Sequence, residues 1–191
     1  MMTQSFLMDY RFIFVPAALG VLLPALFLPW VVINFLGLTP FSAFDIVRST
    51  LWQDDSESSD QKSRFDLQDL ISSYRDTSTT VVASIVLYIA SIIGMAVAIP
   101  FRRHRSTIAL SAGILAIASS LLWFYSIETL KSNFAQQAAM TGGIIGEEFK
   151  GHERSLADII VGLGLGPYVA LAGGVIGTLT FISHKATIVK N

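Results

Sequence analysis

The sequence predicts an all-α protein, a four-helix transmembrane bundle formed by one membrane domain over residues 1–191. Three observations lead to this prediction. The chain is 52% hydrophobic and only 14% charged, whereas soluble domains carry about 25% charged residues. Four apolar stretches, about 12–38, 79–100, 106–127 and 159–183, are each long enough to cross a hydrocarbon core of about 30 Å as a helix. None of them contains Asp, Glu, Lys, Arg or His.

The first span contains Pro16, Pro24 and Pro29, and each proline removes one helical hydrogen bond. We therefore expect a kink or an unwound segment in this span. Its apolar run is about twice as long as the roughly 7–15 residues of a signal peptide, and no clean cleavage site follows it. We expect a retained anchor.

The second and third spans are joined by the short turn Phe101–Arg105, which contains three arginines. Short loops rich in Lys and Arg remain on the cytoplasmic side. Six of the 13 basic residues lie in this turn and in the two terminal segments. Thirteen of the 14 acidic residues lie in the stretches between spans one and two and between spans three and four. The sequence therefore predicts that both termini are cytoplasmic.

Two larger extracytoplasmic loops are predicted at about 39–78 and 128–158. The centre of the first loop is polar and acidic, which is typical of a solvated segment. The second loop begins with Glu128–Met140, which has no Gly or Pro and is rich in Ala and Gln. We expect the third helix to continue through this stretch.

Residues for catalysis or metal binding are scarce. The absence of cysteine excludes disulfides, thiolate metal sites and cysteine nucleophiles, and no nucleotide-binding, serine-nucleophile or zinc-protease motif is present. Five residues of the second loop carry metal-ligand side chains, but we interpret them as solvated loop residues: Glu147, Glu148, His152, Glu153 and Asp158. We therefore expect no enzyme activity, cofactor or metal, and a net charge of −1 gives no field that attracts nucleic acid.

The remaining polar groups within the spans are hydroxyls and one amide. Ionisable residues are absent there, which argues against a proton-coupled transporter or a pump. We expect the hydroxyls to bond to the preceding turn or to a neighbouring helix. The alternative is a small channel with a polar pore between protomers, lined by such residues as Asn34, Ser84, Ser91, Ser111, Ser119, Ser120 and Thr178.

Small residues form a stripe along the fourth span, with further glycines beside it. Such a face lets another helix backbone approach closely. We predict packing within the chain, with docking of a partner subunit as the alternative. Pro167 is expected to bend this span. The predicted packing residues are Gly162, Gly166, Ala170, Gly173, Gly174 and Gly177, and the stripe extends to Thr178.

The predicted topology, with Trp30 and Trp52 bordering the first outer loop and a glycine-rich last span, resembles the claudin and peripheral-myelin-protein group of tetraspan proteins. Claudins carry paired cysteines in that loop, and this chain has none, so paracellular sealing is not implied. Pro29-Trp30 and the segment Gly164–Tyr168 are also similar to small prokaryotic four-span membrane proteins. These resemblances imply a fold and no defined activity.

We therefore expect a non-catalytic, multi-pass protein of the cell membrane. The leading hypothesis is a structural or accessory subunit of a larger membrane complex, for example a respiratory or oxygenase-type assembly. One alternative is a self-associating, claudin-like tetraspan that organises the membrane, and another is the small channel or facilitator. The expected partners are the lipid bilayer and either other membrane subunits or copies of the chain itself.

Overall fold

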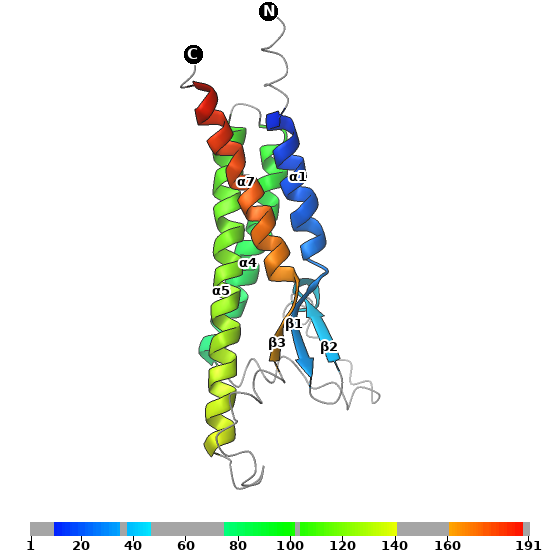
Figure 1. Cartoon of the computed structure of the whole chain (residues 1–191), viewed down its shortest axis with the longest axis vertical. Helices are drawn as coiled ribbons and strands as arrows, with labels where there is room; N and C mark the ends of the chain where they lie inside the picture. Colours follow the sequence, from blue (N-terminus) through cyan, green and yellow to red (C-terminus); the bar gives the residue numbers. More distant parts are fainter. Residues whose placement is uncertain (1–9, 35–37, 47–74, 102–103, 141–160, 189–191) are drawn as a thin grey trace, which may run out of the picture.

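The chain is mostly helical, with a small three-stranded sheet at one end (Figure 1). A computed structural model describes residues 10–34, 38–46, 75–101, 104–140 and 161–188. The helices are α1 (Tyr10–Ala25), α4 (Arg75–Ala98), α5 (Arg105–Met140) and α7 (Gly166–Ile188). The strands are β1 (Pro29–Asn34), β2 (Leu38–Ser42) and β3 (Val161–Leu163). The prediction of an all-α chain is wrong, because three segments of this apolar sequence form strands.

The four helices pack side by side. α4 packs along α5, α5 along α7, α7 along α1, and α1 along α4. Since α1 and α5 each contact both α4 and α7, they lie at opposite corners of the group (Figure 1). The first turn of α1, the last turn of α7, the end of α4 and the start of α5 lie at the end away from the sheet (Figure 1).

Two helices are long and apolar enough to cross a membrane. Their qualifying segments are Thr79–Ala98 in α4 and Arg105–Asn133 in α5. These segments coincide with the predicted second and third spans. The predicted continuation of the third helix is confirmed, since α5 reaches Met140. Shorter apolar helical segments occur in α1, at Ile13–Ala25, and in α7, at Gly166–Phe181.

The first span, predicted as a helix over about 12–38, is helical only as far as Ala25. Pro16 and Pro24 lie inside α1, and Pro29 begins strand β1. The expectation of an unwound segment is confirmed. Its physical cause is the loss of N–H donors at Pro24 and Pro29, after which the β-branched run Val31–Ile33 pairs with other strands.

The fourth span, predicted as a helix over about 159–183, begins as a strand. β3 is followed by Gly164, and α7 starts at Gly166. Pro167 is therefore the second residue of α7 and does not bend it, because a proline in the first turn has no intrahelical N–H bond to lose. A Cβ atom at Gly164 would collide with the Pro29 carbonyl, so the close approach of β3 to β1 requires glycine there.

The sheet is antiparallel, with the order β2-β1-β3. Both edge strands are protected. β3 lies against α5, and in β2 Pro40 has no N–H group to offer. The Ser42 N–H donates to Asp45 Oδ2 at 2.9 Å, while Asp45 N–H donates to Ser42 Oγ at 3.1 Å. This reciprocal cap ends β2 and leaves little edge for another strand to join.

Candidate functional site

Three aromatic side chains meet where the helices join the sheet. Trp30 of β1 lies between Tyr88 of α4 and Trp123 of α5, with ring centroids 4.8 Å and 5.1 Å away, respectively. All three are almost completely buried, and both contacts are edge-to-face, a favoured geometry for aromatic pairs. The cluster therefore fastens the first strand to the two long helices.

The cluster also satisfies the backbone at the end of α1. The last four carbonyls of a helix have no partner within it. In α1 all four accept hydrogen bonds, two from aromatic side chains and two from the following turn. The Tyr88 hydroxyl donates to Leu22, the Leu26 N–H to Leu23 at 3.2 Å, the Phe27 N–H to Pro24 at 3.0 Å, and the Trp30 indole to Ala25 at 2.7 Å. The helix thus ends in the protein interior without an unpaired terminal carbonyl.

Trp30 is held through its backbone as well. Its carbonyl accepts from the Trp123 indole N–H at 3.1 Å and from the Gly164 N–H at 3.1 Å. A Cβ atom at Gly166 would collide with the Trp30 indole ring. Trp30 therefore joins β1 to α5, to β3 and to the start of α7. This arrangement provides a rigid junction and contains no nucleophile or general acid–base pair.

Sequence reasoning did not predict this junction. Tyr88 and Trp123 lie within apolar spans, and each carries a polar atom that needs a partner when it is buried. That requirement is a usable signal that the two residues contact backbone acceptors. It does not identify Leu22 and Trp30 as those acceptors, because they lie 66 and 93 residues away, respectively.

Several hydroxyls in the spans are bonded to backbone carbonyls, as predicted, but the buried Thr180 Oγ1 of α7 has no hydrogen-bond partner among the described residues. Within helices, Ser84 donates to Val81 at 2.7 Å, Ser91 to Tyr88 at 2.7 Å, Ser120 to Ala116 at 3.0 Å and Thr178 to Val175 at 2.8 Å. Between helices, Ser119 of α5 donates to the Ser84 carbonyl of α4 at 2.7 Å. Ser111 is exposed, and the side chain of Asn34 lies outside the described part. The hydroxyls in these bonds have their proton engaged by a carbonyl of the same chain.

The predicted small-residue stripe is helical only from Gly166 onward, because Gly162 lies in β3 and faces Val32. Its helical members are buried against other parts of the same chain. Gly166 lies against Trp30, Gly173 against Leu22 and Val21, Gly174 against Gly113 and Ile117, and Gly177 against Met95; Ala170 is fully buried. α1, α4 and α5 therefore occupy the faces that a partner helix would use.

The outward faces of the helices are apolar. Large hydrophobic side chains are exposed on each of them, including Ile13 and Leu23 on α1, Val86 and Ile93 on α4, Ile114 and Leu121 on α5, and Val175 and Leu179 on α7. Only 39% of the apolar segment of α4, and likewise of α5, is buried inside the protein. The helices therefore enclose a mainly apolar core with a few hydroxyls in it, and they also expose large apolar side chains on their outward faces.

Charged groups lie near the ends of the long helices. Arg105 begins α5, and its Nε–H donates to the Ala98 carbonyl at 3.2 Å, which caps the end of α4. Glu128 and Lys131 lie 3.4 Å apart near the other end of α5. Among the described residues, no group of three His, Cys, Asp or Glu side chains is arranged to hold a metal. The acidic cluster from Glu147 to Asp158 lies outside the described residues.

Comparisons with known proteins returned no match: no protein-family model, no curated protein and no solved structure is significantly similar to this chain.

Proposed function

We propose that this chain is an integral, multi-pass membrane protein whose four helices form a transmembrane bundle. Its proposed role is non-catalytic, as a structural or accessory subunit of a larger membrane complex. The observation that carries this proposal is the set of large apolar side chains that are exposed on the outward faces of all four helices. An apolar surface is more stable in contact with the hydrocarbon of a bilayer than in contact with water.

A water-soluble helical protein is the main competing explanation for the two long apolar helices. The core helices of a soluble protein are mostly buried, whereas 39% of each apolar segment is buried here. Exposed contiguous apolar surface of this kind is rare on soluble monomers. The side-chain distribution therefore favours the bilayer.

The short helix α1 is compatible with this proposal. Its 16 residues span only about 24 Å at about 1.5 Å per residue. Non-helical backbone at membrane depth is tolerated only where protein satisfies its polar groups. The hydrogen bonds from Tyr88 and Trp30 to the end of α1 meet that condition. α7, with 23 residues, is about 34 Å long and needs no such support.

The proposed orientation follows from the basic residues. The end of α4 and the start of α5, which the arginine-rich turn of the sequence connects, lie at the same end as the start of α1 and the end of α7 (Figure 1). The positive-inside rule places this end in the cytoplasm. The sheet and the long loops are then extracytoplasmic, and the plasma membrane is the proposed location.

An accessory role fits the absence of a reactive constellation among the described residues and the rigid junction at Trp30. Four of the serines named for a pore donate their hydroxyls to backbone carbonyls, which disfavours the channel alternative: Ser84, Ser91, Ser119 and Ser120. The small-residue stripe of α7 is used within the chain, so a partner would contact the outward faces of the helices or the extracytoplasmic segments.

The test is extraction of the native membrane in a mild detergent, followed by native mass spectrometry of the purified chain. The accessory role predicts foreign subunits in fixed stoichiometry. Oligomers of this chain alone would replace it with the self-associating tetraspan, and a lone monomer that conducts ions or solutes in liposomes would replace it with the channel. Gly20→Leu tests whether a partner subunit contacts the outward face of α1, since a Cβ atom at Gly20 has nothing within 4 Å in the chain.

A further inference from the structure

Four aromatic rings are exposed where the helices meet the sheet. They are Phe27, Phe44, Tyr125 and Tyr168, each between 45% and 64% exposed, and we call them the aromatic girdle. Every one of them is large and apolar, yet the chain leaves it on the surface.

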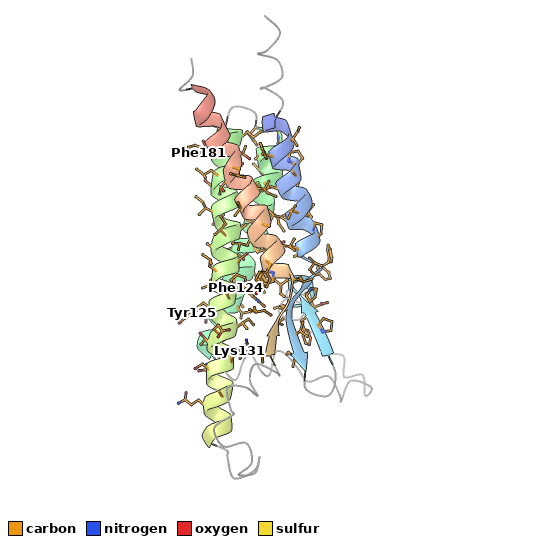
Figure 2. All side chains as sticks on the ribbon, viewed as in Figure 1. Phe124, Tyr125, Lys131 and Phe181 are labelled. Carbon is orange, nitrogen blue, oxygen red and sulfur yellow. The ribbon has the colours of Figure 1, made fainter. Side chains whose placement is uncertain are left out.

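All four rings lie near the junction of the helices with the sheet. Phe27 follows the end of α1, and the Phe44 N–H donates to the Leu26 carbonyl at 3.1 Å, which keeps the Phe27 and Phe44 rings 5.6 Å apart. Tyr168 lies in the first turn of α7, directly after the sheet, and its ring is 5.1 Å from that of Phe124. Figure 2 places Phe124 and its neighbour Tyr125 beside the same junction.

The girdle extends around several sides of the molecule. Phe27 belongs to the end of α1 and Tyr125 to α5, and these helices lie at opposite corners of the group, with Tyr168 on the α7 that packs between them (Figure 1). A single docked helix covers one side only. A planar surface that surrounds the molecule contacts all of these sides.

The spacing along α5 matches the thickness of a bilayer. Arg105 and Tyr125 are separated by 20 residues, which is about 30 Å of helix, and the hydrocarbon core is about 30 Å thick. Between them the exposed side chains include Ile114 and Leu121, whereas the exposed residues that the structure describes beyond Tyr125 are polar: Glu128, Ser132 and Gln136. Lys131, farther along α5, lies beyond the girdle (Figure 2).

We infer that the aromatic girdle contacts the headgroup region of the lipid bilayer and fixes the depth of the protein, with the sheet just outside the hydrocarbon. This inference rests on the proposed membrane location. Tyrosine side chains such as Tyr125 and Tyr168 concentrate at this level because an apolar ring and a polar tip fit the two sides of the interface; Phe27 and Phe44 have no polar tip and join the girdle by their position and exposure. This depth also keeps the non-helical backbone of the sheet out of contact with the hydrocarbon, where lipid-exposed backbone of that kind is not tolerated.

The experiment uses the absence of cysteine from the natural chain. Single substitutions Phe27→Cys, Phe44→Cys, Tyr125→Cys and Tyr168→Cys are spin-labelled, and the full chain is reconstituted in phosphatidylcholine–phosphatidylglycerol vesicles. Collision rates with oxygen and with a water-soluble nickel chelate give the depth of each label. Ile114→Cys serves as the control inside the bilayer, and Leu165→Cys, 64% exposed beside the girdle, provides a second position at its level.

The inference predicts one common depth for the girdle labels, at the headgroups. The Ile114 label should lie about 16 Å deeper than the Tyr125 label, since 11 residues of helix separate them. Low collision rates with both reagents at a girdle position would show a protein contact and overturn the inference, as would girdle labels fully exposed to water. Water exposure of the Ile114 label as well would instead overturn the membrane proposal itself.

Discussion

Helices α5 and α7 approach each other closely at Gly113 and Gly174. A Cβ atom built on Gly174 would lie 2.9 Å from the Gly113 carbonyl oxygen and 2.9 Å from Ile117 Cγ1. A Cβ atom on Gly113 would lie 2.7 Å from the Gly174 carbonyl oxygen and 2.9 Å from the Thr178 backbone nitrogen. Backbone atoms cannot rotate away, so either methyl group would force the two helices apart.

Gly174→Ala therefore tests the packing of the bundle. Adding one methylene-sized group to a filled interior costs about 1–3 kcal/mol, and we expect a loss of this size in the free energy of unfolding. Gly113→Ala should cost a similar amount. The double variant should lose less than the sum of the two, because the first separation of the helices also makes room for the second methyl group.

The matched control is Gly20→Ala, since Gly20 is helical and has nothing within 4 Å of the added Cβ. Alanine there should leave stability unchanged or raise it by up to about 1 kcal/mol. Unfolding in mixed micelles with increasing dodecyl sulfate measures all four variants. A Gly174→Ala protein as stable as the Gly20→Ala protein, or strict additivity in the double variant, would refute the close approach of α5 to α7.

Two substitutions that each remove one hydrogen bond are also expected to lower the free energy of unfolding. Tyr88→Phe removes the donor to the Leu22 carbonyl and should lower the free energy of unfolding by about 1–3 kcal/mol, whereas Tyr125→Phe, at an exposed position, should have no effect. Ser119→Ala removes a bond between α4 and α5 and should cost about 0.6 and at most about 1.7 kcal/mol, with Ser111→Ala as the exposed control. Equal stability of either pair in the same titration would contradict the corresponding assignment.

Helices α4 and α5 were predictable from sequence because nothing in them competes with helix formation. The apolar segments of α4 and α5 contain no proline, and as long helices they satisfy the hydrogen bonds of their own backbone. A continuous apolar run does not separate a buried strand from a helix, however. The apolar pattern alone therefore could not predict the strands at the end of the first span and at the start of the fourth.

That information was partly present in the residues around Pro29. The run Val31–Ile33 is β-branched, and Pro24 and Pro29 remove helical donors on its amino-terminal side. What local sequence does not contain is the partner. β1 pairs with β3, which lies more than a hundred residues further along the chain, and Gly164 is needed only because the two backbones meet there.

The bonding of most interior hydroxyls was predictable in kind because a buried hydroxyl favours an acceptor, and the carbonyl of the preceding helical turn is within reach. The bonds of Ser84 and Ser91 follow that rule. Thr180 is an exception, since its buried Oγ1 has no partner among the described residues. The aromatic junction was not predictable, since Trp30, Tyr88 and Trp123 come from three elements that meet only after folding.

The central claim is that the exposed apolar faces of the helices lie in a bilayer. Alkaline carbonate extraction of native membranes, followed by ultracentrifugation, tests it most directly, because carbonate at high pH releases soluble and peripheral proteins and leaves integral ones in the membrane. We predict that the full chain stays in the membrane pellet and is released only by detergent. Recovery of the chain in the supernatant as a soluble protein would contradict the account.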